Sequence, residues 1–136
     1  DKMSDDPVSR YHCVLVYSER NRLWQLFDLE TSNGTLVKRT DEVGSESFLI
    51  AGLGANNKNV AYEVVGVPAG KIPLEAIAER TGAGIGDDAA DFASCGVPVK
   101  EGDEICLGFR IVENEDGSLG FGPRNKSCIV KITELV

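Results

Sequence analysis

The sequence is poor in histidine and has no long apolar run. His12 is the only histidine in the 136 residues, so a Ser-His or Cys-His catalytic pair would have to use it. Because His12 stands in a strand-like run, we interpret it as a structural residue. The longest apolar runs, such as residues 48–51, are strand-sized and far below the ~18 residues of a membrane span. Nucleophilic catalysis and a membrane-spanning helix therefore have no support in the sequence.

Positive charge is also scarce. Fourteen Lys and Arg residues face 22 Asp and Glu residues, which gives a formal net charge of −8. Binding to a phosphate backbone requires clustered positive charge, and the most basic stretch, residues 20–39, is interspersed with acidic residues. We therefore expect neither nucleic acid nor membrane as a partner. A protein partner or self-association into a homo-oligomer agrees with this composition.

The cysteines are few and widely spaced, and no C-x-x-C pair occurs among Cys13, Cys95, Cys106 and Cys128. Four cysteines allow three disulfide pairings, and the sequence does not choose between them. Three of them, Cys13, Cys106 and Cys128, lie in apolar strand-like runs, which predicts buried thiols that pack as small hydrophobic groups. A zinc site would need further ligands from scattered positions, and we expect no cofactor.

The composition is that of a globular protein, with 42% hydrophobic and 26% charged residues. No linker, repeat or low-complexity tract divides the chain. Residues 1–3 resemble the end of an enterokinase tag, which leaves a single β-rich domain over residues 4–136 and Met3 as a natural start. Because no signal peptide follows Met3, we expect a cytoplasmic protein. The alternative is a secreted protein whose leader was removed.

Strand signals dominate the first half of the chain. The Asn33-Gly34 pair favours a tight hairpin, because both central positions of such a turn need positive φ. Residues 54–59 have the composition of a polar loop. β-Branched and aromatic residues predict an antiparallel meander with strands at residues 11–18, 23–30, 35–40, 47–53 and 60–67.

The middle of the chain differs from its flanks. Residues 72–82 carry an apolar stripe at helical spacing, with Pro73 suited to the first turn and Gly82 to the end; a second short helix is predicted over residues 88–95. Strand patterns return at residues 104–112 and 127–136, with a hairpin at Asp116-Gly117. We therefore predict a mostly β α+β fold, an antiparallel β-sandwich or partly closed barrel with a short helical insertion near 71–95.

A glycine- and aspartate-rich segment, residues 82–91, is the one candidate site for chemistry. Glycines let the backbone approach a phosphate, and neighbouring carboxylates can share Mg²⁺. The candidate ligand-binding residues are Gly84, Gly86, Asp87 and Asp88, and the candidate metal ligands are Asp87, Asp88 and Asp91. Residues 84–90 resemble the metal–nucleotide loop of thiamine-monophosphate kinases and aminoimidazole-ribonucleotide synthetases. The alternative is a connection between two helices in which Asp87 caps the second helix.

Three functions agree with these observations. The first is a non-enzymatic protein-interaction or assembly module, oligomeric and presenting the edge of an antiparallel sheet. The second is a small-ligand or phosphate/Mg²⁺-binding domain that uses residues 82–91. The third is an acidic chaperone or inhibitor that masks a basic partner through its net charge.

Overall fold

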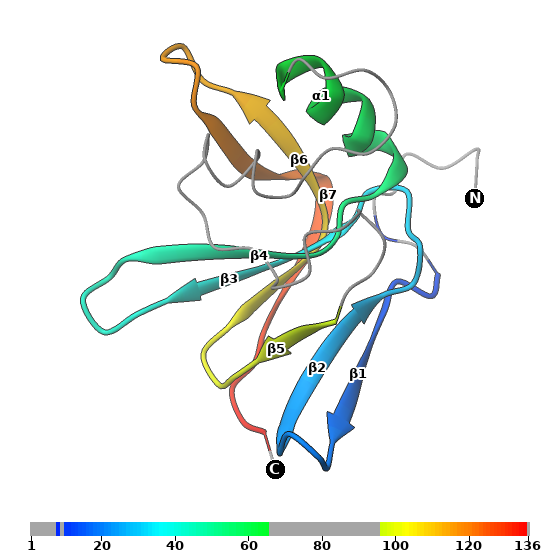
Figure 1. The fold of residues 1–136 in the computed structure, drawn as a ribbon, viewed down its shortest axis with the longest axis vertical. Coiled ribbons are helices and arrows are strands. Elements are labelled where there is room, and N and C mark those ends of the chain that lie inside the picture. The colour runs from blue at the N-terminus through cyan, green and yellow to red at the C-terminus, as the bar shows by residue number, and fades with distance from the viewer. Residues whose placement is uncertain (1–7, 9, 66–95, 136) are drawn as a thin grey trace.

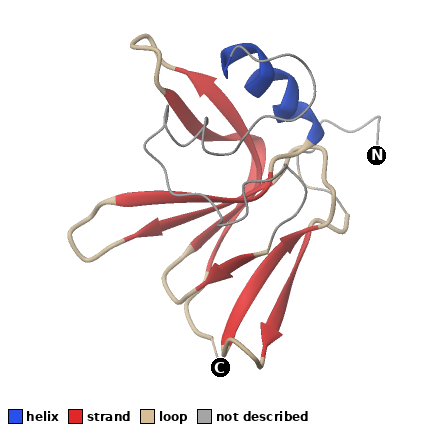
Figure 2. Cartoon of the chain, viewed as in Figure 1, coloured by secondary structure: helices blue, strands red, loops and turns tan. Residues whose placement is uncertain are grey.

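The computed structural model describes residue 8, residues 10–65 and residues 96–135 (Figure 1). Two antiparallel sheets form a sandwich, which confirms the predicted fold class. One sheet has the order β1 (Cys13–Ser18), β2 (Leu23–Asp28), β5 (Val97–Val99); the other has the order β4 (Glu46–Gly52), β3 (Thr35–Thr40), β6 (Glu104–Glu113), β7 (Leu119–Lys131). Figure 2 shows the strands beside α1 (Ala55–Val65), the one helix of the described residues.

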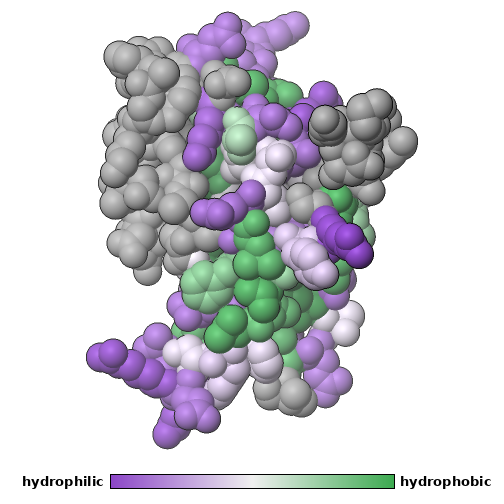
Figure 3. All heavy atoms as spheres, turned by 90° about the vertical axis from the view of Figure 1, so that its right-hand side faces the viewer, coloured by the Kyte–Doolittle hydropathy of each residue, from purple (hydrophilic) through white to green (hydrophobic). Residues whose placement is uncertain are grey.

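The β1–β2 hairpin forms as expected, with residues 19–22 as its turn and Cys13 opposite Asp28. Strand β2 buries one side, where Leu26 is fully buried and Asp28 is only 4% exposed. Strand β1 is different, because apolar side chains on both of its faces reach solvent: Val14, Leu15, Val16 and Tyr17. Figure 3 shows apolar residues gathered on the lower half of the face that β1 occupies. This sheet is thus covered on only part of its surface.

The predicted hairpin at Asn33-Gly34 is wrong. Strands β2 and β3 belong to different sheets, so the loop between them crosses from one sheet to the other. Gly34 does have positive φ, 76°. The loop is held by the side chain of Asp28, however, and not by pairing of β2 with β3. The Asp28 carboxylate accepts hydrogen bonds from Thr31 and Thr35. The meander prediction therefore fails at this connection.

The strand predicted at residues 60–67 and the loop predicted at residues 54–59 are also wrong, because α1 begins at Ala55. The segment buries residues at helical spacing: Asn57 and Ala61 are fully buried, and Val60 and Val64 pack against the core. Positions i, i+3, i+4 and i+7 share one face of a helix. Burial of this face against the β6 side of the sandwich overrides the β preference of the valines.

A bulge at Gly108 divides the core into two clusters. Gly108 has φ of 90°, and the register of β6 against β7 shifts there. Before the bulge, Ile105 and Leu107 face the cluster shared with β2 and β5. After it, Phe109 and Ile111 face the cluster that α1 covers. The alternating apolar residues of the strand predicted at residues 104–112 are therefore divided between two clusters.

The cysteine predictions have mixed outcomes. Cys106 is buried as expected, Cys13 is half-buried, and Cys128 is exposed, contrary to prediction. Burial raises the pKa of the Cys13 thiol, with a smaller contribution from Asp28, and burial also raises the pKa of the Cys106 thiol. None of these three takes part in a disulfide. Cys95 lies outside the described residues, as do residues 1–3 and the helices predicted over residues 72–82 and 88–95.

Arg39 links the two sheets. Its Nε and Nη2 atoms donate to the carboxylate of Asp103 at 3.0 and 2.8 Å, and Nη2 also donates to the carbonyl oxygen of Pro98 in the other sheet at 2.9 Å. Asp103 is 2% exposed. A two-point contact with a buried carboxylate is among the stronger polar contacts in a protein.

Replacing Arg39 should therefore cost more stability than replacing its neighbour. We expect Arg39→Gln to lower the free energy of unfolding by about 2–3 kcal/mol, because Asp103 stays buried without its cation. Lys38→Gln is the matched control. Lys38 pairs with Glu46 and Glu104 at 3.2 and 3.5 Å on the surface, where such pairs contribute less than about 1 kcal/mol. Urea denaturation measures both, and equal losses would contradict the expectation.

Candidate functional site: a loop surface at one end of the sandwich

Three segments meet at the end of the sandwich where β2 runs into β3. They are residues 10–12 before β1, residues 29–34 between β2 and β3, and residues 53–57 at the start of α1 (Figure 1, right of centre). The Nε2 atom of buried His12 lies 2.7 Å from the carbonyl oxygen of Gly34, and since that oxygen accepts, His12 donates. The N–H of Asn56 donates to Ser32 at 2.8 Å. The three segments are therefore held together directly.

Asp28 organises the loop from beneath. Its Oδ1 accepts hydrogen bonds from the hydroxyls of Thr31 and Thr35 at 2.7 and 2.6 Å, and its Oδ2 accepts the N–H of Thr31 at 3.0 Å. Thr31 Oγ1 in turn accepts the N–H of Gly34 at 2.9 Å. All three polar side chains are at most 5% exposed. A buried network with its partners satisfied holds a loop in one conformation.

Gly34 packs too closely for any side chain. A Cβ atom there would lie 2.6 Å from the carbonyl oxygens of Gly52 and Leu53 and 2.6 Å from the ring of Phe109. The Gly34 carbonyl also accepts the N–H of Gly108 at 2.9 Å. The loop is thus pressed against β4 and β6, and its outer side alone faces solvent.

The start of α1 is held by buried Asn57. Its amide donates to the carbonyl oxygens of Leu53 and Phe109 at 2.8 and 3.0 Å, and its Oδ1 accepts from Arg124 Nη2 at 3.2 Å. Arg124 Nε donates to Phe109 as well, at 2.9 Å. Burial, with repulsion from Arg110, lowers the pKa of Arg124, but an arginine stays protonated near neutral pH. A positive charge therefore lies beneath the helix start.

The solvent side of these segments presents polar donors, and we call it the loop surface: Arg10, Tyr11, Ser32, Asn33 and Asn56. Tyr11 is 74% exposed, and the Arg10 guanidinium lies 6.0 Å from the centre of its ring. Asn33 Oδ1 accepts from Asn56 Nδ2 at 2.9 Å, which fixes both amides. Guanidinium, hydroxyl and amide donors are the groups that bind phosphate or carboxylate oxygens in proteins.

The residues that the sequence singled out for ligand binding are not among these. Gly84, Gly86, Asp87, Asp88 and Asp91 all lie outside the described residues. In the part of the chain that the structure describes, no three His, Cys, Asp or Glu side chains gather as a metal site would require. No helix within residues 10–65 or 96–135 is long and apolar enough to cross a membrane.

Sequence reasoning missed the loop surface because it interpreted Asn33-Gly34 as a hairpin turn. His12 is buried and hydrogen-bonded, which confirms its interpretation as structural. A usable signal was the run of small polar residues and glycine over positions 31–35, which begins three residues after Asp28. Side chains of this kind bind their own backbone in loops.

A scan of family models matches residues 2–46 to the FHA domain. The match spans about a third of the chain and includes β1, β2, β3 and the loop that carries Ser32 and Asn33. Searches of the curated proteins and of the solved structures gave no match. The first third of this chain, with most of the loop surface, is therefore similar to FHA domains.

Proposed function

We propose that this chain is a non-enzymatic protein-interaction module that binds phosphothreonine-containing segments of partner proteins at the loop surface. FHA domains bind phosphothreonine peptides, and they belong to the modules that recognise phosphorylated motifs through charged donors. The matched residues 2–46 contain four of the five residues of the loop surface. The partner is a phosphorylated protein.

The observation that carries this function is the contrast between the two sides of the 29–34 loop. Its inner side is fixed by Asp28, Thr31 and His12, all buried and hydrogen-bonded. Its outer side exposes Ser32 and half-exposes Asn33. Donors held in place before a ligand arrives lose little conformational entropy on binding, which favours affinity. Loops fixed on a rigid sandwich are suited to recognising a peptide.

Charge favours a phosphate at this place in particular. A phosphothreonine carries about −1.5 to −2 charges at neutral pH and three acceptor oxygens. The chain as a whole is negative, at −8, so a phosphopeptide needs a local cation to approach. Arg10 is exposed beside the loop, where it can donate two hydrogen bonds to the phosphate. We therefore assign Arg10 the phosphate contact.

The test uses immobilised degenerate peptides with a fixed central phosphothreonine, phosphoserine or threonine, and biolayer interferometry as the readout. We expect binding to the phosphothreonine peptides and little binding to the unphosphorylated ones. Arg10→Gln should weaken that binding about tenfold or more, since a hydrogen bond to a charged group contributes about 1.5–3 kcal/mol.

Arg20→Gln is the matched control, because Arg20 is an exposed arginine in the β1–β2 turn at the other end of β1. It should bind like the unchanged chain. Equal binding of phosphorylated and unphosphorylated peptides would refute the proposal. Full binding by Arg10→Gln would refute the role of that residue.

Other expectations from the sequence stay predictions. Self-association and the cytoplasmic location are untested, and size-exclusion chromatography with light scattering would measure the first. The phosphate/Mg²⁺ function depends on residues 82–91, outside the described residues. Masking of a basic partner depends on net charge alone, and its affinity would fall steeply with salt.

A further inference from the structure

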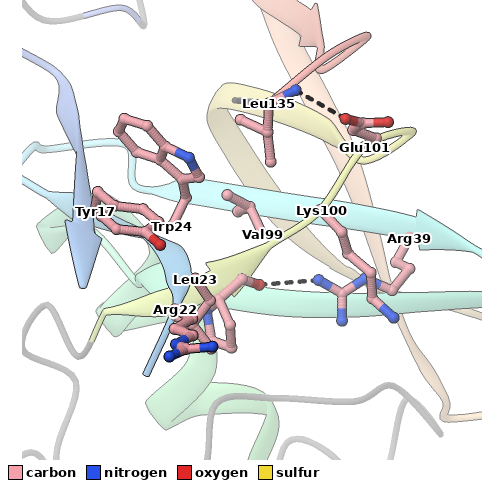
Figure 4. A pocket seen from close by; sticks show the side chains of 10 residues that line it. Tyr17, Arg22, Leu23, Trp24, Arg39, Val99, Lys100, Glu101 and Leu135 are labelled. Atoms are coloured by element: carbon pink, nitrogen blue, oxygen red, sulfur yellow. Dashed lines mark hydrogen bonds between the residues drawn. The ribbon is translucent and has the colours of Figure 1, made fainter. Parts of the chain in front are cut away.

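A concave surface lies at the opposite end of the sandwich from the loop surface. It is a groove of about 760 Å³ between the β1–β2 turn, β5 and the last residues described (Figure 4). We call it the basic groove, and its lining is Tyr17, Arg22, Leu23, Trp24, Arg39, Pro98, Val99, Lys100, Glu101 and Leu135. Trp24, which lines the groove, lies near the start of β2, and Asp28, which lies beneath the loop surface, ends that strand. The two residues are about 13 Å apart along the strand.

One wall of the groove is aromatic and apolar. Tyr17 and Trp24 stand edge to face with ring centroids 5.4 Å apart. Val99 pairs with Trp24 across β2 and β5, and Figure 4 shows Val99 and Leu135 facing the indole. The N–H of Leu135 donates to Glu101 Oε2 at 3.0 Å, which holds the end of the described chain over the groove. This wall is suited to a large apolar side chain.

The other wall carries positive charge, part of it unpaired. Arg39 is neutralised by its two-point contact with Asp103. Arg22 and Lys100 are both exposed, and within the described residues neither forms an ion pair. The lining thus has three cations and one carboxylate, Glu101, on a chain of net charge −8. Such cations attract the carboxylates of an acidic segment and repel the cations of a basic one.

We propose that the basic groove binds an acidic segment of a partner protein, with a large apolar side chain against Trp24, Val99 and Leu135. Carboxylates on either side of that apolar residue then pair with Arg22 and Lys100. This site is additional to the phosphothreonine function and shares no residue with the loop surface. The charges are complementary, and the lining combines apolar surface with a small number of polar groups, as peptide-binding pockets do.

Trp24 supplies a built-in reporter, because it is the only tryptophan of the chain. The experiment titrates the full chain with two capped hexapeptides and follows tryptophan fluorescence. The first peptide has a leucine flanked by glutamates, and in the second, glutamine replaces each glutamate. We expect a saturable change with the first peptide and at least about tenfold weaker binding of the second. Equal affinity for the two peptides, or a response to free glutamate at the same concentration, would overturn the proposal.

Charge variants locate the binding. Arg22→Gln and Lys100→Gln should each weaken binding of the glutamate peptide about threefold, as expected for partly exposed ion pairs. The double variant should weaken it about tenfold. Arg110→Gln removes an exposed cation of β6 outside the groove and should have no effect. Thermal melting by circular dichroism checks that each variant is folded. Unchanged binding by the folded double variant refutes the proposal.

Arg10→Gln separates this proposal from the phosphothreonine function. It should weaken phosphopeptide binding about tenfold or more and leave the tryptophan titration unchanged. Weaker binding of the glutamate peptide by Arg10→Gln would mean that the peptide binds the loop surface, which also overturns the proposal.

Discussion

Gly34→Ala is expected to lower the free energy of unfolding by about 3 kcal/mol or more. Two costs add at this position. Gly34 has φ of 76°, and a non-glycine residue in the left-handed region costs roughly 1–2 kcal/mol. The new Cβ atom would also lie 2.6 Å from two backbone carbonyl oxygens, and overpacking of this kind costs about 1–3 kcal/mol. Because small domains are only about 5–15 kcal/mol stable, this one change threatens folding.

Gly44→Ala is the matched control for the close approach. Gly44 has φ of 88°, and nothing lies within 4 Å of a Cβ atom built there. It therefore carries the conformational cost alone, roughly 1–2 kcal/mol. Urea denaturation of both variants gives the difference directly. Equal losses of unfolding free energy would mean that the close contact of the 29–34 loop with β4 adds nothing to the cost of Gly34→Ala.

Asp28→Ala should be similarly damaging, with a loss of about 4 kcal/mol. The change leaves the buried hydroxyls of Thr31 and Thr35 and the N–H of Thr31 without their acceptor. Each unsatisfied buried donor costs about 1–3 kcal/mol. The folded fraction should also lose phosphothreonine binding, because Asp28 fixes the loop that carries Ser32.

Asp41→Ala controls for the loss of an aspartate that caps a loop. Asp41 Oδ1 accepts the N–H groups of Val43 and Ser45, both at 2.9 Å, in an exposed turn. Water replaces the lost acceptor there, so we expect a loss below about 1 kcal/mol. Chemical denaturation measures the two variants side by side. A loss at Asp28 as small as that at Asp41 would contradict the structural role of the buried network.

The strands were largely predictable because their signals are local. The β1–β2 hairpin, β4 and the Asp116-Gly117 turn all follow from β-branched residues, alternation and turn chemistry within a few positions. The assignment of individual strands to the two sheets was not predictable. It depends on β5 pairing with β2 and on β6 pairing with β3, contacts between segments far apart in the chain.

The segment at residues 55–65 shows a different failure. Val60 and Val64 favour a strand by propensity, yet they share a helical face with Asn57 and Ala61. The helical spacing was readable, but an asparagine at a core position does not look apolar. Asn57 is buried because four backbone or side-chain groups satisfy its amide, which only the folded environment provides.

The loop surface could not be predicted from the sequence for a related reason. Asn33-Gly34 favours a hairpin by composition, and only the burial of Asp28 beneath the loop turns it into a crossover. Arg10 and Ser32 are separated in sequence, and a hydrogen bond between His12 and Gly34 joins the two segments that carry them. Composition alone indicated a protein-interaction module but gave none of these residues.

The pairing of early strands with late ones also governs how the chain becomes folded during synthesis. Trp24 meets Val99, and Val37 meets Ile105, so one sheet is complete only after β5 has been synthesised and the other only after β7. Pairings of such long sequence separation form slowly. Until then β1 to β4 emerge with unpaired edges, and such edges promote aggregation. Lower growth temperature or slower translation should therefore raise the yield of folded protein more than it would for a helical domain of equal length.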